Sequence, residues 1–121
     1  MESQLAASYL RMYRKKSWLS QRELAEVLGL ITEWRISEHE RSISVPHLLT
    51  AMSYEIVFNV PISKLFPGIY ETVRENIESR LGKLESRLQE SNAKGRAAVP
   101  IARKLEWLCE RKNPATSELP V

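Results

Sequence analysis

Apolar residues recur at spacings of three and four along most of the chain, and no segment alternates apolar and polar residues between turn signals. The first pattern places side chains on one face of an α-helix, whereas the second would be typical of a β-strand. The sequence therefore predicts an all-α protein. A first helix is expected over residues 4–16, with one apolar face made by Leu5, Tyr9, Met12 and Tyr13.

Ser20 and Glu23 have the spacing of a capping box, in which the serine oxygen accepts from a first-turn amide and the glutamate binds back to the cap amide. A second helix is expected to begin there and to end at Gly29, because a left-handed C-terminal cap favours glycine. Thr32 is expected to cap a third helix over residues 33–40. We therefore expect two short helices that are joined by a glycine turn.

Pro46 suits the first turn of a fourth helix, because its ring fixes a helical φ and its missing N–H would have no partner there. Asn59 is expected to end this helix, and one more helical turn follows over residues 60–66. Pro67 and Gly68 are then expected to close the first domain, which would comprise residues 1–68.

Beyond residue 68 a second apolar row lies among charged residues, at spacings typical of a coiled coil: Tyr70, Ile77, Leu81, Leu84 and Leu88. The row is short, so a plain amphipathic helix that packs on the first domain is the alternative. Gly82 within it would cost about 1 kcal/mol relative to alanine.

After a loop at residues 91–95, Pro100 is expected to open a last helix with four residues on one face: Ile101, Leu105, Leu108 and Cys109. Residues 69–112 thus form a helical extension that we expect to mediate dimerisation. Residues 113–121 are expected to be a flexible tail.

Composition narrows the class of protein. With 121 residues, 43% of them hydrophobic and 27% charged, the chain can form one compact domain with an appendage. No apolar run could span a membrane and the N-terminus has no secretory pattern, so we expect a cytoplasmic protein without a membrane partner. Cys109 is the only cysteine, and is expected to be a small apolar residue on a helix, or else to form an intermolecular disulfide.

The net charge of +3 permits nucleic-acid binding without requiring it. The distribution of charge is more informative, because the basic residues gather near the N-terminus: Arg11, Arg14, Lys15, Lys16 and Arg22. Any attraction for phosphate should be strongest there.

Catalysis finds no support in the sequence. The chain has no aspartate, no glycine-rich phosphate loop, no Gly-x-Ser-x-Gly motif and no histidine paired with a nucleophile, so we expect no enzyme and no cofactor. His39 and His47 are interpreted as unrelated surface or core histidines, because metal ligation needs three or four ligands.

The run Ser-Gln-Arg-Glu-Leu-Ala-Glu-Val-Leu-Gly at residues 20–29 resembles the Ser-Gln-x-x-Leu-Ala-x-x-x-Gly signature of the XRE family, the phage repressor and Cro-like helix-turn-helix regulators. Arg14, Glu40 and the apolar positions of the fourth and fifth helices also match, so the resemblance covers residues 5–66. It implies a five-helix repressor-like helix-turn-helix domain followed by the C-terminal helical extension. It also implies that Arg14 and Glu40 form a buried salt bridge.

In such a domain the second helix is held to the DNA backbone and the third presents its N-terminal residues to base edges in the major groove. Between Gly29 and Glu40 this chain has one residue more than the usual family spacing, which we place at Leu30 or Ile31. The register of the third helix is therefore open by one residue. The residues predicted to contact DNA are Gln21, Arg22, Thr32, Glu33, Trp34, Arg35, Glu38, Arg41, Ser42 and Ser44.

Several of these assignments have alternatives. Gln21 is expected to bind a phosphate, or else to be a solvated surface residue. Arg35 is the best candidate for a base contact, with phosphate contact or pairing with Glu38 as alternatives. Trp34 either touches DNA or lies in the core. Arg41 and the two serines after it contact the backbone or belong to a solvated loop.

We therefore expect a sequence-specific regulator of transcription, a repressor that binds an inverted repeat in double-stranded DNA as a homodimer. Glu33 and Glu38 would repel phosphates, and they favour the rival hypothesis of an antitoxin or adaptor that binds a protein partner. An oligomeric scaffold built on the C-terminal helices is a third possibility.

Overall fold

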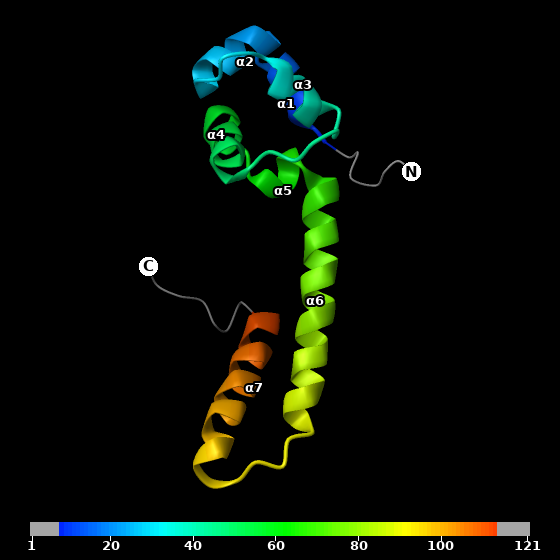
Figure 1. Cartoon of the computed structure of the whole chain (residues 1–121), viewed down its shortest axis with the longest axis vertical. Coiled ribbons are helices and arrows are strands. Elements are labelled where there is room, and N and C mark those ends of the chain that lie inside the picture. Colours follow the sequence, from blue (N-terminus) through cyan, green and yellow to red (C-terminus); the bar gives the residue numbers. More distant parts are fainter. Residues whose placement is uncertain (1–7, 114–121) are drawn as a thin grey trace. The chain divides into compact units, whose positions relative to one another are not determined.

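A computed structural model describes residues 8–113, and over these residues the regular structure is entirely helical (Figure 1). The elements are α1 (Leu10–Lys16), α2 (Gln21–Leu28), α3 (Trp34–Glu40), α4 (Leu48–Phe58), α5 (Ile62–Leu65), α6 (Pro67–Gln89), the 3-10 turn η2 (Gly95–Ala97) and α7 (Ala98–Lys112). The predicted all-α fold is confirmed. The expected helical residues 4–7 and the expected tail from residue 114 onward lie outside the described residues.

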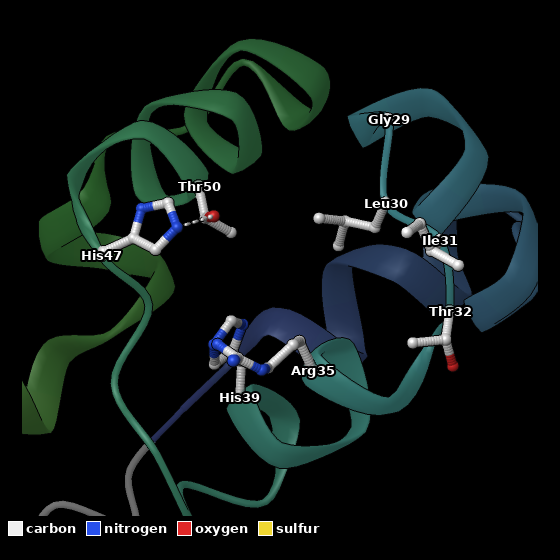
Figure 2. A pocket seen from close by; sticks show the side chains of 8 residues that line it. All are labelled: Gly29, Leu30, Ile31, Thr32, Arg35, His39, His47 and Thr50. Atoms are coloured by element: carbon white, nitrogen blue, oxygen red, sulfur yellow. Dashed lines mark hydrogen bonds between the residues drawn. The ribbon is translucent and has the colours of Figure 1, made fainter.

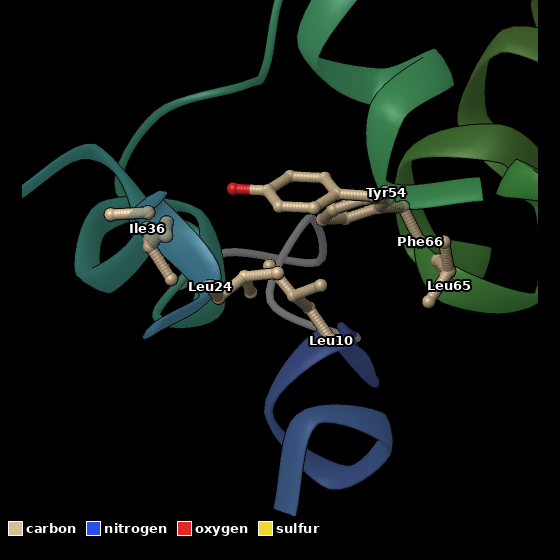
Figure 3. Close-up of a cluster of buried hydrophobic side chains, with 7 residues drawn as sticks. Leu10, Leu24, Ile36, Tyr54, Leu65 and Phe66 are labelled. Carbon is tan, nitrogen blue, oxygen red and sulfur yellow. The ribbon is translucent and has the colours of Figure 1, made fainter. Parts of the chain in front are cut away.

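The chain divides into two compact units, Met1–Glu75 and Asn76–Val121, and the long helix α6 contributes to both. Within the first unit, α1 to α5 enclose one core made of Leu10, Leu24, Ala25, Ile36, Tyr54, Leu65 and Phe66. Each of these five helices supplies at least one buried side chain, and Figure 3 shows Leu10, Leu24 and Tyr54 directed toward one another. Burying each large apolar side chain contributes about 2 kcal/mol, so the core holds the short helices in place.

The local signals around α2 are confirmed. The backbone N–H of Ser20 donates to Glu23 Oε1 at 2.9 Å, and the backbone N–H of Glu23 donates to Ser20 Oγ at 3.0 Å. Gly29 caps the other end of the helix with φ 77° and ψ 23°, a left-handed conformation that glycine adopts without a steric penalty. The capping box and the glycine turn therefore set both ends of α2.

Several helix starts differ from the predictions. The first helix, expected over residues 4–16, begins at Leu10, and the described residues 8 and 9 precede it. α3 begins at Trp34 rather than Glu33, because the Thr32 hydroxyl accepts from the backbone N–H of Trp34 at 3.2 Å and leaves Glu33 as the flanking residue. α4 begins at Leu48, and Pro46 precedes it instead of lying in its first turn. His47, the N-cap, has extended backbone angles, so the fixed φ of Pro46 serves the incoming loop.

The predictions at Asn59 and at Pro67 have different outcomes. Asn59 ends α4 as predicted, in a left-handed conformation with φ 59°. Pro67 and Gly68 do not form a break between helices as expected, because they lie in the first turn of α6. Proline is tolerated there since its missing N–H has no partner within the first turn. The domain boundary at residue 68 stays a prediction.

In the second unit, residues 76–89 of α6 lie alongside helix α7 (Figure 1). Two ion pairs join the two helices. Arg111 Nη2 lies 2.9 Å from Glu78 Oε2, and Lys112 Nζ lies 2.9 Å from Glu85 Oε1. The row predicted on α6 is partly covered here: Leu88 is buried, and Leu81 and Leu84 are half-buried.

The predicted last helix begins at Ala98, two residues before Pro100. Leu108 is buried in this helix. Cys109 was expected on the same face as Leu108, but it is exposed, so that prediction is wrong. No helix among the described residues combines the length and the apolar character needed to cross a membrane.

Candidate nucleic-acid interface

The Arg14–Glu40 salt bridge fixes α1 against the end of α3. Both guanidinium Nε and Nη2 of Arg14 donate to the Glu40 carboxylate, the latter at 3.2 Å, and Nη1 donates to the backbone oxygen of Leu19 at 2.9 Å. The two side chains are 9% and 3% exposed, respectively. This buried pair is structural, as the sequence resemblance implied, and it sets the position of α3 relative to α1.

Gln21, the first residue of α2, is attached to the same carboxylate. Its Nε2 donates to Glu40 Oε1 at 3.1 Å, and the side chain is half-buried. The alternative of a purely solvated glutamine is therefore wrong. This bond links the start of α2 to the end of α3, so the two helices of the motif share one electrostatic anchor.

One face of α3 is buried through Ile36 and His39. Helical spacing places three residues on the opposite side: Trp34, Glu38 and Arg41. Trp34 is 59% exposed, so the interpretation that it belongs to the core is wrong. An indole of this size at the first position of a helix leaves a large flat apolar surface in solvent, where it can stack or contact a methyl group.

The loop after α3 is held against the same helix. Arg41 is exposed and its Nε donates to Ser37 Oγ at 3.2 Å, while Ser44 Oγ donates to Glu38 at 3.2 Å. Ser42 has φ 60°, and its hydroxyl is buried without a hydrogen-bond partner among the described residues. The Ser44 bond thus fixes this loop to Glu38 of α3.

The acidic residues of α3 have polar neighbours that offset their charge. Glu33 Oε1 lies 4.0 Å from Arg22 Nη2, a pair with side chains 39% and 74% exposed, and Glu38 accepts the Ser44 bond. No Arg35–Glu38 ion pair occurs between residues 8 and 113. Arg22 and Arg41 are both exposed, so the exposed surface of the motif carries cations as well as these glutamates.

Arg35 lies on a different side of α3 from Trp34. It lines a cavity between α3 and α4 together with His39, four residues further along the same helix, and with His47 (Figure 2). Sequence reasoning could not anticipate this placement, because the face that an exposed arginine adopts follows from how α3 is rotated against the core. A base contact by Arg35 stays a prediction.

His39 is a core residue rather than a surface one. It is 3% exposed, and its Nδ1 lies 2.8 Å from the Tyr54 hydroxyl, with the two rings in edge-to-face contact. Burial is the main cause of a lowered His39 pKa, and electrostatic interactions with Arg35 and His47 lower it further, against an opposing effect of Glu38. Burial likewise raises the pKa of the Tyr54 hydroxyl. No group of three metal-ligating side chains occurs within the described part of the chain.

Trp18 was not among the predicted contact residues. It is 92% exposed and has φ 62°, a left-handed conformation that is uncommon for a bulky residue. It borders a hollow of about 340 Å³ that Lys15 and Ser20 also line. The available signal was a lone tryptophan between the basic end of the first helix and the Ser20 cap.

Comparison with known proteins agrees with this geometry. Residues 10–65, which include α1 to α5, match the family model described as helix-turn-helix. No curated protein and no solved structure matches the chain.

Proposed function

The chain carries over residues 10–65 a helix-turn-helix domain of the XRE family of DNA-binding regulators, and from this premise we propose that it is a sequence-specific repressor. It binds an inverted repeat as a homodimer, with one α3 in each of two major grooves about one helical turn apart. The observation that carries this proposal is the solvent-exposed surface of the motif, on which Trp34 at the start of α3 is 59% exposed and Arg22 of α2 and Arg41 at the end of α3 are also exposed.

Each residue has a distinct role in the proposed complex. Trp34 contacts a thymine methyl group or a deoxyribose, because its indole offers apolar surface and one N–H donor. Arg22 and Arg41 bind phosphates on the two sides of the groove, together with Gln21, Thr32, Ser42 and Ser44. Glu33 and Glu38 accept from cytosine amino groups, which gives sequence preference in spite of their negative charge.

The homodimer has an apolar surface available to it on the first unit. Leu48, Leu49, Met52 and Ile56 of α4 are all exposed, and they follow one another at helical spacing. Sedimentation analysis of the full chain tests the proposal. Ile56→Glu would break a dimer built on α4, and Ile77→Glu would break one built on the exposed part of α6, so the two variants separate the two modes.

DNA binding is tested by selecting duplexes from a random pool and measuring mobility shifts at two salt concentrations. A repressor should enrich a palindromic motif, and its affinity should fall as salt rises because released counterions drive phosphate contacts. Failure to enrich any motif would refute sequence-specific binding.

Single variants assign the roles. Trp34→Ala should lower affinity for the selected duplex far more than affinity for random DNA, whereas Arg41→Ala should weaken both and reduce the salt dependence. Arg103→Ala removes another exposed cation, from α7, and serves as the matched control. Equal losses for Arg103→Ala and Arg41→Ala would mean that net charge alone is responsible.

A protein partner is the second candidate, favoured by Glu33 and Glu38 and by the exposed apolar row of α4. An antitoxin or adaptor purified from its native host would bring down a second protein, of different mass, in stoichiometric amount. Recovery of the chain alone, or with DNA, would favour the repressor.

A further inference from the structure

A cavity of about 350 Å³ opens between the turn after α2, one side of α3 and the start of α4 (Figure 2). Leu30 and Ile31 supply apolar surface from the turn. The helices supply nitrogen-bearing and hydroxyl side chains, namely Arg35, His39, His47 and Thr50. This combination of apolar surface and a few convergent polar groups is typical of small-molecule sites.

The charge of the cavity lining is one-sided. No carboxylate is present among the described residues that line it, and Arg35, which is always protonated, forms no ion pair with any residue between 8 and 113. His39 and His47 line the same cavity as Arg35, whereas Glu38, whose charge also acts on His39, does not line it. An uncompensated guanidinium beside two imidazoles favours an anion.

The hydrogen-bonding state of the two histidines leaves room for a ligand. His39 uses Nδ1 for the Tyr54 hydroxyl, so Nε2 is its remaining polar atom. His47 Nε2 and Thr50 Oγ1 are 3.4 Å apart, a long contact that a better partner can replace. Polar atoms of two histidines and one threonine therefore lie on the same cavity as the guanidinium.

The size of the cavity indicates more than an inorganic ion. One water occupies about 30 Å³ in the liquid, so the space accommodates roughly ten non-hydrogen atoms. A carboxylate matches the planar fork of one arginine, and an apolar remainder matches Leu30 and Ile31. We propose that this cavity binds a small organic carboxylate with a short apolar body, held by Arg35 and by the polar groups of the α4 start.

A regulatory consequence follows if the proposed DNA-binding function is correct, and only this consequence rests on it. Thr32 and Arg35 belong to the start of the α3 segment, so a bound anion would neutralise Arg35 and add negative charge beside the DNA. The ligand should therefore weaken binding of the selected duplex, and by reciprocity the duplex should weaken binding of the ligand.

The direct test needs no DNA. The full-length protein, labelled with ¹⁵N, is titrated near neutral pH and at constant ionic strength with benzoate, with its neutral isostere benzamide and with inorganic phosphate. We expect saturable shifts of the amides of Gly29, Ile31 and Thr50 with benzoate and much smaller shifts with the other two. Equal shifts with benzamide, or shifts with benzoate that spread over all basic surfaces without saturation, would overturn the proposal.

Variants identify the anion contact. Arg35→Gln should weaken benzoate binding about tenfold or more, as loss of a charge-assisted hydrogen bond requires. Arg103→Gln, an exposed arginine of α7, should leave the affinity unchanged, and the amide spectrum of each variant shows whether it is folded. An unchanged affinity in a folded Arg35→Gln variant would refute the role of Arg35.

Duplex DNA distinguishes the source of the anion. If DNA shifts the amides of the cavity while benzoate does not, the anion is a backbone phosphate and the small-ligand proposal fails. If benzoate binds but no duplex is ever selected, the cavity proposal stands and the repressor proposal fails.

Discussion

Replacing Glu40 by alanine should unfold most of the first unit, because it leaves the Arg14 guanidinium buried without a counter-ion. Arg14 is only 9% exposed and Glu40 only 3%, so little water is available to replace the lost carboxylate. Gln21 would lose its acceptor as well, and Arg14 would keep only its bond to Leu19. Removing one partner of a buried pair typically costs about 3–5 kcal/mol.

That loss is large relative to the stability available. A domain the length of residues 10–65 is expected to have a free energy of unfolding of about 3–8 kcal/mol at the usual value per residue. Glu40→Ala should therefore bring the first unit close to its unfolding midpoint without denaturant. Urea titration followed through the amide signals of Leu24 and Ile36 measures this unit alone, whereas circular dichroism would also report the helices of residues 76–112.

Two further variants make the reasoning refutable. Arg22→Ala breaks the exposed pair with Glu33 and should cost no more than about 1 kcal/mol. The double variant Arg14→Met with Glu40→Leu strands no charge and should be more stable than Glu40→Ala. If Glu40→Ala cost no more than Arg22→Ala, the buried pair would not hold α1 to α3.

Three other predictions concern stability. The pKa of His39 is lowered in the folded state from its usual 6.5, so the unfolded chain takes up the proton first. The free energy of unfolding should therefore fall as the pH drops below about 6.5 and toward the lowered folded-state pKa; His39→Gln should flatten this dependence in urea titrations at two pH values. Trp18→Gly should stabilise the first unit by roughly 0.5–1 kcal/mol, because it relieves a left-handed backbone and loses almost no packing, and a lower thermal midpoint would contradict this. Gly29→Ala should destabilise by about 1 kcal/mol through backbone strain alone, since an added Cβ meets no atom within 4 Å; a loss of several kcal/mol would mean that the turn is packed more tightly.

The sequence by itself determined the features whose causes are local. The Ser20–Glu23 capping box, the left-handed Gly29 and the end of α4 at Asn59 each depend on residues within one helical turn, so their spacing sufficed. The Arg14–Glu40 bridge is not local, and it was predicted through resemblance to a family rather than from spacing. Pro46 and Pro67 show the limit of local rules, because the same fixed φ suits a loop before a helix and the first turn inside one.

Tertiary structure alone decided which way the side chains of α3 face. The packing of Ile36 and His39 against the core rotates the helix so that Trp34 lies in solvent and Arg35 lies on the cavity with His47. It also brings Gln21 to the Glu40 carboxylate, across nineteen positions of sequence. One extra residue in the turn left the register open in the sequence, and a change of one residue rotates every side chain of a helix by roughly 100°. The position of α3 in the helix-turn-helix motif could therefore be predicted from the sequence, whereas the side chains that α3 exposes depend on contacts between helices.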